Sequence, residues 1–266
     1  MCILFRRRQR VIVFAGFVMI AAVLAATSAW ATNGTWSATA DLGLVQGPNT
    51  ATLLQDGRVL VVGRGNLGQF AEIYDPASAT WTRQADPIRY RLNPTATLLP
   101  DGRVLLVGGD GSDGYKTTET FDPAMNSWAP SGDLNVPRTN GQIVALVDGR
   151  VLMAGGVALH GFDPVQEAEI YDPATGLWTV TGSMVIGLPS FTMTALQDGT
   201  VLAAGGTYDD IKFEVYDPVT GTWSQTGDMT GANRGFTLVA LRRVEEVTVS
   251  CRSSLALSAV SSFVRV

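Results

Sequence analysis

The chain has 266 residues, of which 46% are hydrophobic and 16% are charged, and its formal net charge at pH 7 is −5. Nucleic-acid-binding domains need a basic face and anionic membrane surfaces attract basic residues, so this acidic composition disfavours both partners. A single histidine also disfavours Ser-His-Asp hydrolases and zinc sites built from histidines.

The first 31 residues predict a secretory signal peptide. Four arginines lie between positions 6 and 10, residues 11–26 are apolar and uncharged, and Ala29-Trp30-Ala31 fits the small-x-small rule of signal peptidase. Cleavage after Ala31 implies a secreted protein, extracellular or periplasmic, with no membrane insertion. An uncleaved anchor is the alternative, although the 16 apolar residues are fewer than the ~20 that a spanning helix needs.

Cleavage changes the charge and the cysteine count of the mature chain. Without the four arginines, 15 basic residues stand against 24 acidic ones, which gives a net charge of about −9. Cys2 is removed too, so Cys251 is left alone and no intramolecular disulfide is expected. About 235 residues remain, enough to bury a sizeable core without one.

An internal repeat occupies most of the mature chain. Asp-Gly-Arg-Val-Leu stands at 56–60, 101–105 and 148–152, and Asp-Gly-Thr-Val-Leu stands at 198–202. Behind each block comes an aromatic-Asp-Pro triplet, and seven residues after the aromatic comes a tryptophan. The aromatics are Tyr74, Phe121, Tyr171 and Tyr216, and the tryptophans are Trp81, Trp128, Trp178 and Trp223. A period in the forties with this composition is typical of propeller blades.

One repeat predicts a four-stranded antiparallel meander. In the second repeat, strands are expected at 95–99 and 104–107, joined by Asp101-Gly102 in a type I′ turn with positive φ at both central residues. A third strand is expected at 119–121 and a fourth at Trp128, separated by Asp122-Pro123, a dipeptide that favours a turn. A glycine doublet ends the second strand and allows close backbone approach.

These residues match the kelch motif, in which a glycine doublet, a tyrosine and a tryptophan mark the ends of blade strands two, three and four. Over about Trp36 to Leu241, the chain resembles bacterial kelch-repeat proteins and the propeller of galactose oxidase. The resemblance implies an all-β, kelch-type β-propeller with four full repeats and terminal strands, about five blades in all. Gly63-Arg64 departs from the doublet, so an irregular inner turn is expected in the first blade. The doublets are Gly108, Gly109, Gly155, Gly156, Gly205 and Gly206.

The repeated residues are expected to be structural. Large aromatics fill the wedge between neighbouring sheets. A glutamate stands two residues before each aromatic and is expected to accept hydrogen bonds within its blade. The glutamates are Glu72, Glu119, Glu169 and Glu214.

The propeller is assigned to residues 32–242. Residues 243–266 form a degenerate C-terminal tail. Residues 236–241 begin another first strand, but no Asp-Gly hairpin follows. One interpretation is that tail strands at 246–250 and 255–260 pair with a strand near Trp36 and close a fifth blade. The other is that the tail reflects a frameshift or truncation of a longer propeller gene, and the six or seven blades usual in the kelch family favour it.

Variable loops on one face are the expected binding surface. They join strand two to strand three within a blade (2–3 loops) and strand four to the next blade (4–1 loops). Aromatic, carboxylate and guanidinium groups in them suit sugar rings and hydroxyls. The candidate ligand-binding residues are Arg64, Tyr90, Arg91, Asp110, Asp113, Tyr115, Arg138, Asp163, Tyr208, Asp209 and Arg234.

No catalytic residue, cofactor or metal ligand is predicted. The galactose oxidase resemblance implies a copper site with two histidines, two tyrosines and a cysteine crosslinked to one of the tyrosines. The chain has a single histidine, His160, and its one mature cysteine, Cys251, lies in the degenerate tail. Residues 110–114 offer oxygen ligands but do not match a calcium loop.

The expected function is therefore a non-enzymatic module that binds carbohydrate or an extracellular protein. The alternatives are a carbohydrate-active enzyme that uses paired loop carboxylates, and a nonfunctional remnant of a longer protein.

Overall fold

The computed structural model describes residues 50–65, 68–91, 93–109, 115–158, 163–188, 191–207, 210–227, 236–240, 247–251 and 261–264. The chain divides into two units, 1–38 and 39–266, and every described residue lies in the second. The expected signal peptide and the strand near Trp36 lie outside the described residues. No helix within these ranges is long and apolar enough to cross a membrane.

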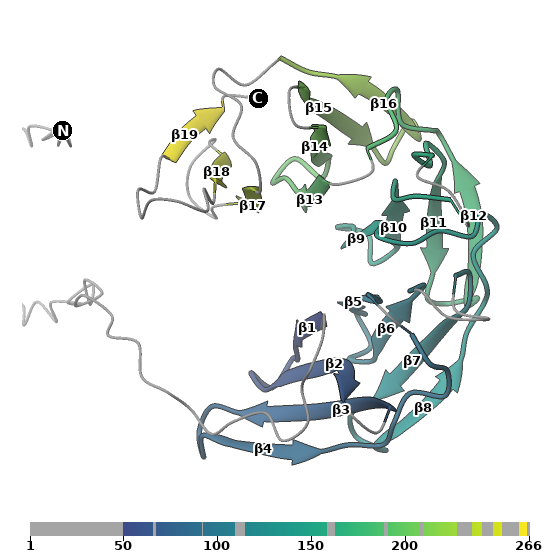
Figure 1. Cartoon of the computed structure of the whole chain (residues 1–266), viewed down its shortest axis with the longest axis vertical. Coiled ribbons are helices and arrows are strands. Elements are labelled where there is room, and N and C mark those ends of the chain that lie inside the picture. The colour runs from purple at the N-terminus through teal and green to yellow at the C-terminus, as the bar shows by residue number, and fades with distance from the viewer. Residues whose placement is uncertain are drawn as a thin grey trace, which may run out of the picture. The chain divides into compact units, whose positions relative to one another are not determined.

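Four four-stranded antiparallel sheets follow one another along the chain (Figure 1). Blade 1 contains β1 (Thr50–Leu53), β2 (Val59–Gly65), β3 (Gly68–Asp75) and β4 (Thr80–Arg83). Blade 2 contains β5 (Thr95–Leu98), β6 (Val104–Val107), β7 (Thr118–Asp122) and β8 (Ser127–Pro130). Blade 3 contains β9 (Gln142–Ala145), β10 (Val151–Ala154), β11 (Ala168–Asp172) and β12 (Leu177–Thr181). Blade 4 contains β13 (Phe191–Ala195), β14 (Val201–Thr207), β15 (Asp210–Asp217) and β16 (Thr222–Gln225). The predicted four-stranded meander is confirmed in all four repeats.

A fifth sheet has three strands, β17 (Phe236–Ala240), β18 (Val247–Cys251) and β19 (Ser261–Val264). The first strand of the unfinished repeat thus pairs with a strand of the tail. The first expected tail strand lies at β18, but β19 begins after the end of the second expected range. Closure of the propeller by a strand near Trp36 stays a prediction.

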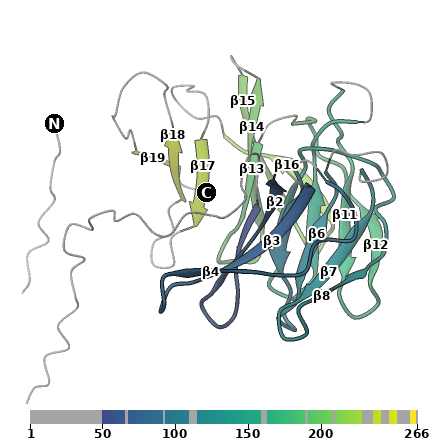
Figure 2. The ribbon, with the colours of Figure 1, turned by 60° about the horizontal axis from the view of Figure 1, so that its bottom comes forward.

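The core consists of hydrophobic side chains packed between consecutive blades, so blades 2 and 3 contribute from both faces of their sheets. Successive side chains of a strand point to opposite faces, so Val151 and Met153 of β10 pack toward blade 2 while Leu152 and Ala154 pack toward blade 4. All four are buried. A strand covered on both faces needs a continuous apolar run. Figure 2 shows β3, β6, β7 and β11 of successive blades lying side by side.

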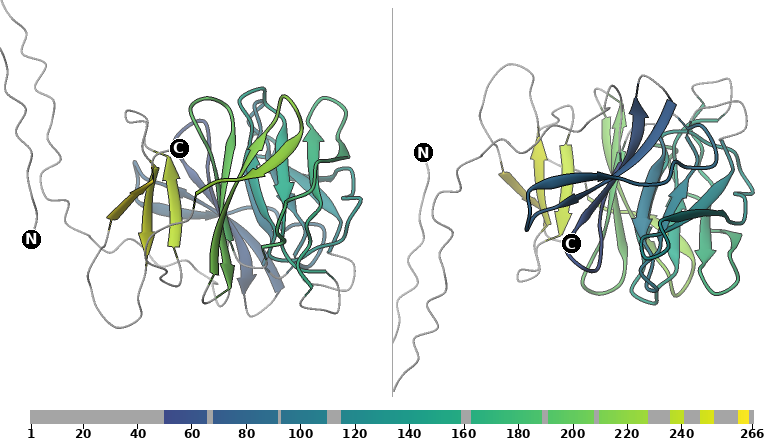
Figure 3. Two further views of the ribbon diagram at one scale, coloured as in Figure 1. Left: turned by 90° about the horizontal axis from the view of Figure 1, so that it is seen from above. Right: turned by 90° about the horizontal axis from the view of Figure 1, so that it is seen from below.

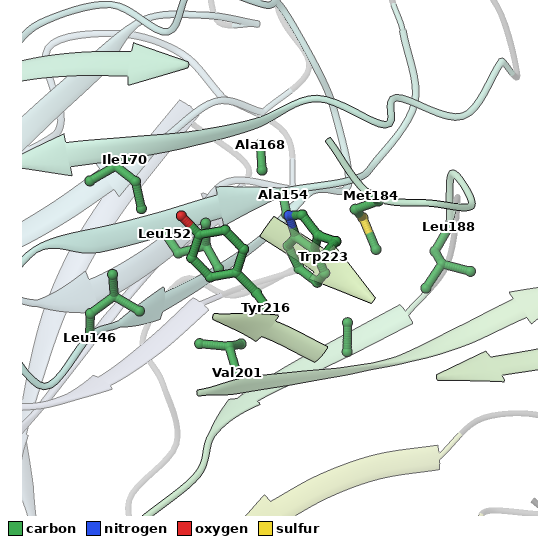
Figure 4. Packing of buried hydrophobic residues seen from close by; sticks show 11 residues of the cluster. Leu146, Leu152, Ala154, Ala168, Ile170, Met184, Leu188, Val201, Tyr216 and Trp223 are labelled. Atoms are coloured by element: carbon green, nitrogen blue, oxygen red, sulfur yellow. The ribbon is translucent and has the colours of Figure 1, made fainter. Parts of the chain in front are cut away.

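The repeated aromatics of blades 2, 3 and 4 fill the wedge between blades, as predicted. In blade 4 the Tyr216 and Trp223 rings lie with centroids 5.1 Å apart. Tyr216 points toward Leu146, Leu152 and Ile170 of blade 3, and Trp223 lies beside Ala154 of the same blade (Figure 4). The Tyr216 hydroxyl also lies 2.7 Å from the Thr181 hydroxyl at the end of β12. The aromatic pairs of blades 2, 3 and 4 therefore each fix their own blade against the preceding one.

The hairpins between first and second strands are not type I′ turns, and that prediction was wrong. In blade 1, the Leu54 N–H donates to the Arg58 carbonyl at 2.8 Å, and the Gly57 N–H donates to the Leu54 carbonyl at 3.1 Å. Gly57 has a φ of 87°, and no aspartate among the described residues has positive φ. This is the three-residue loop in which a type I turn precedes a left-handed glycine. The aspartate acts through its side chain, which accepts the Arg58 N–H at 3.0 Å.

Consecutive hairpins also overlap in one direction. A Cβ on Gly102 would lie 3.1 Å from the Gln55 side chain of the preceding hairpin, and one on Gly149 would lie 2.9 Å from Pro100. The Gln55 amide donates to the Pro100 carbonyl at 3.0 Å. The residue before each Asp-Gly therefore covers the glycine of the next blade.

The first blade is regular at Gly63-Arg64, against expectation. Both residues pair with β3, as Gly63 with Phe70 and Arg64 with Gln69. The departures from regular structure occur instead at the glycine doublets of blades 2 and 3. The φ angles there are 62° and 100° at Gly108 and Gly109, and 62° and 90° at Gly155 and Gly156.

We predict that Gly182→Ala destabilises the protein by about 1 to 3 kcal/mol, the usual cost of overpacking. The added Cβ would lie 2.1 Å from the Gly221 carbonyl oxygen in the next blade. Gly227→Ala is the matched control, because Gly227 has the same place in its repeat but no atom of the described residues lies within 4 Å of an added Cβ. Urea unfolding of both variants measures the difference, and an equal loss in the two would contradict the role of this contact.

Candidate functional site

The loops of the described blades form two ends, seen in Figure 3. The 2–3 and 4–1 loops form what we call the loop face, and hydrogen bonds between them show that they adjoin. The Arg91 N–H donates to the Gln69 side chain at 2.9 Å, and the Arg138 N–H donates to the Tyr115 carbonyl at 3.0 Å. The hairpins between first and second strands and the turns between third and fourth strands form the opposite end, the turn face.

Aspartates of the turn face bond within their own turns. The Arg150 guanidinium lies 2.7 Å from the Asp148 carboxylate, and the Arg150 N–H donates to the same carboxylate at 3.0 Å. Together they hold the pKa of Asp148 below its ordinary value. Asp172 accepts the Ala174 N–H at 2.9 Å in the turn of the same blade.

Buried glutamates fix the 4–1 loops of the loop face. Glu169 accepts the N–H groups of Asn135 and Val136 at 2.7 and 3.0 Å, and Arg138 donates to it at 2.8 Å. The side chains of Arg138 and Glu169 are both 0% exposed. Burial lowers the pKa of Arg138, and the neighbouring carboxylate acts in the opposite direction. The glutamate was expected to bond within its blade, but its partners are in the loop that enters the blade.

Blade 2 repeats this arrangement. Glu119 accepts the N–H groups of Ile88 and Arg89 at 2.7 and 3.3 Å, and Arg91 donates to it at 2.9 Å. Two residues beyond each arginine stands an asparagine with positive φ, 55° at Asn93 and 56° at Asn140. Asparagine tolerates this conformation better than other residues with a Cβ. It lets the chain turn from the buried arginine into the next first strand.

Blade 4 keeps the glutamate without the arginine. Glu214 accepts the N–H groups of Val185 and Ile186 at 2.7 and 2.8 Å. Leu188 stands where the arginine stands in the two preceding loops, ten residues after the tryptophan. Burial raises the pKa of Glu214, and the two N–H donors oppose that shift.

Arg91 and Arg138 therefore need correction as candidate ligand-binding residues. They are 1% and 0% exposed, so their guanidinium groups are part of the interior and not of the surface. An arginine in a predicted loop is normally expected to be exposed to solvent, which is why both were assigned to the surface. The missed signal was their shared position ten residues after Trp81 and Trp128.

Four of the other candidates lie within the described residues. Arg64, Tyr90 and Asp163 are exposed and Tyr115 is half-buried. Arg64 pairs with Gln69 across β2 and β3, and Gln69 bonds the main chain of Arg91, next to Tyr90. Asp110, Asp113, Tyr208, Asp209 and Arg234 lie outside the described residues, as does His160.

The described part of the loop face offers aromatic and polar side chains but no evident metal site. Within the described ranges, no hydrogen bond or ion pair engages the side chains of the four described candidates. Over those same residues, no three His, Cys, Asp or Glu side chains are grouped to hold a metal ion.

Comparison with known proteins bears on the fold. No family model and no curated protein matches the sequence. The solved structure of YjhT matches with a TM-score of 0.62 and 16% identity, over 78% of this chain and 74% of YjhT. A fungal alcohol oxidase of the AA5 family, in complex with copper, matches with a TM-score of 0.49 and 16% identity, over 77% of this chain and 59% of the oxidase. The match to YjhT confirms the predicted kelch-type β-propeller fold. At this identity it shows the fold alone.

We predict that Glu169→Ala destabilises the protein by about 3 to 5 kcal/mol, because it leaves the Arg138 charge buried and unpaired. Asp101→Ala is the control, since its partner Arg103 is 37% exposed and such surface pairs contribute at most about 1 kcal/mol. Chemical unfolding measures both. Equal losses would mean that the buried pair does not anchor the loop.

A pH dependence follows from the lowered pKa of Asp148. A carboxylate whose pKa is lower in the folded state stabilises the protein above its unfolded pKa, and this contribution is lost as the pH falls through the folded value. The parent is therefore expected to be more stable than Asp148→Asn at pH 7, by less than about 1 kcal/mol. The difference should vanish well below the ordinary value of 3.8. Urea unfolding at both pH values measures this difference. For the control Val219→Ala, at a 92% exposed position, the difference in stability from the parent should be the same at both pH values.

Proposed function

We propose that this kelch propeller is a binding module that recognises carbohydrate through its loop face. The contrast between the two faces carries the proposal. On the turn face, the aspartate and the arginine of each Asp-Gly-Arg hairpin bond one another. On the loop face, Arg64, Tyr90 and Asp163 are exposed and make no side-chain hydrogen bond within the described residues.

The anchoring of the 4–1 loops supports this function. Binding is weakened by the entropy lost when loops become ordered, so a surface fixed in advance binds more tightly. The Glu119 and Glu169 carboxylates fix these loops from inside the protein through main-chain and guanidinium hydrogen bonds. Aromatic rings and hydrogen-bonding groups on such a rigid surface suit the apolar faces and the hydroxyl groups of sugars.

The other expected functions have less support. A protein partner would use the same surface and is the alternative outcome of the test below. The carbohydrate-active enzyme would pair Asp110 or Asp113 with Asp209 or Asp210. Only Asp210, the first residue of β15, lies within the described residues, so no observation favours such a pair. Secretion, which the signal-peptide pattern predicts, would place the module among cell-wall glycans.

We predict that the purified protein binds at least one of peptidoglycan, chitin and cellulose in a pull-down assay. The double variant Tyr90→Ala/Tyr115→Ala should lose most of this binding, because both aromatic surfaces of the described loop face are removed. Met125→Ala/Val219→Ala removes two exposed apolar side chains from the turn face, 73% and 92% exposed, and should bind like the parent. Absence of binding to all three polymers, or equal loss in both double variants, would contradict a carbohydrate site on the loop face. Saturable binding of a purified secreted protein in their place would favour the protein-partner alternative.

A further inference from the structure

The second and third strands of the blades have two different lengths. In blades 1 and 4, β2 and β14 each have seven residues and continue through the glycine positions. In blades 2 and 3, β6 and β10 each have four residues and end before the glycine doublet. At the loop face, the second and third strands therefore separate in blades 2 and 3 and stay paired in blades 1 and 4.

A buried arginine stands at each opening. The Nη1 group of Arg91 donates to the carbonyls of Gly108 and Thr117 at 2.8 and 2.7 Å. These residues face each other just past the ladder of β6 and β7, whose last pair is Val107 and Thr118. The Thr117 carbonyl also accepts the Gly108 N–H at 3.2 Å. The guanidinium thus takes the Gly108 carbonyl, the acceptor that a further ladder hydrogen bond would use.

Blade 3 has the same contacts. The Nη1 group of Arg138 donates to the carbonyls of Gly155 and Glu167, just past the last ladder pair of Ala154 and Ala168. Both arginines therefore occupy the end of a ladder.

Blade 4 separates the effect of the arginine from that of the doublet. It contains the doublet Gly205-Gly206, yet its ladder continues through the pairs Gly205 with Lys212, Gly206 with Ile211 and Thr207 with Asp210. Leu188 has no side-chain donor to compete for these carbonyls. Blades 3 and 4 share the doublet and differ at the arginine position. In blade 1, Arg64 takes the place of the second glycine, and a residue with a Cβ rarely adopts the positive φ found at Gly109 and Gly156.

Arg138 also joins the loops of two blades. Its N–H donates to the Tyr115 carbonyl of blade 2, while its guanidinium bonds the 2–3 loop of blade 3. The next residue, Thr139, exchanges two main-chain hydrogen bonds with Val157, at 3.0 and 2.9 Å. Ala158 in turn donates to the Asp163 carbonyl at 3.0 Å. Segments from two blades and the loop between them thus lie side by side.

We propose that carbohydrate binds at this junction of blades 2 and 3, and that Arg138 is the positioning residue that builds it. The inference rests on the proposed function and assigns it one place on the loop face. The junction consists of Tyr115, Thr139, Asn140, Val157, Ala158 and Asp163. Tyr115 supplies an aromatic surface for a sugar ring, and the exposed Asn140 and Asp163 supply an amide and a carboxylate for hydroxyl groups. These groups suit an uncharged saccharide, since the carboxylate would repel an anionic one.

Two matched leucine variants test the positioning role. Arg138→Leu and Arg91→Leu each introduce the residue that blade 4 carries, and each removes a fully buried guanidinium, so similar losses of thermal stability are expected. Only Arg138→Leu should make the Val157 amide exchange with solvent at least tenfold faster, as measured by hydrogen exchange without any ligand. Only Arg138→Leu should weaken binding of chitohexaose or cellohexaose at least tenfold. Equal effects of the two variants on Val157 exchange and on binding would overturn the proposal.

Two surface variants locate the site without changing either arginine, which matters if Arg138→Leu does not fold. Tyr115→Ala should weaken binding of the same hexasaccharides at least tenfold, and Tyr90→Ala, at the junction of blades 1 and 2, less than threefold. The reverse order would refute a site between blades 2 and 3 while leaving a carbohydrate site on the loop face. Failure of the parent to bind either saccharide would count against the proposed function, and the Val157 exchange rates would still judge the positioning role.

Discussion

A buried carboxylate with main-chain partners organises the path of the chain between blades. Where the chain leaves one sheet and enters the next, consecutive N–H groups enter the interior without ladder partners. Such groups cost free energy unless an acceptor is supplied. The third-strand glutamate supplies both of its oxygens in blades 2, 3 and 4. The direction of each crossing, and hence the packing of one sheet on the next, depends on this acceptor.

The sequence predicted the strands well because their signals are local and repeated. A hairpin, a pair of turn residues and two aromatics recur in fixed order, and each repeat became a four-stranded antiparallel sheet. The hairpin type was predicted wrongly because Asp-Gly alone does not set the number of loop residues. In each hairpin a third residue, such as Gln55, joins the loop, and only the glycine needs a left-handed conformation.

The site could be predicted less well because it depends on contacts between distant residues. Arg91 and Arg138 read as solvated loop residues, yet each is buried beside a glutamate about thirty positions away. Such burial is a tertiary property that no local pattern encodes. The glycine doublets show the same limit, since identical Gly-Gly pairs leave the ladder in blade 3 and stay within it in blade 4. Comparison of equivalent positions across the repeats would have revealed only that Leu188 replaces the arginine of the two preceding loops.

The overlap of consecutive hairpins gives the stack of blades a polarity. Gln55, Pro100 and Val147 each cover a glycine of the following hairpin, at Gly102, Gly149 and Gly199. The covering residue and the covered glycine occupy constant places in the repeat. Blades 2 and 3 therefore each carry a covered glycine toward the preceding blade and a covering residue toward the following one. The two sides of such a blade therefore differ, and each side fits only the opposite side of a neighbouring blade. A duplicated blade inserted between two existing ones would therefore find compatible edges on both sides. This rule would let a gene of this kind gain or lose whole repeats without redesign of its interfaces.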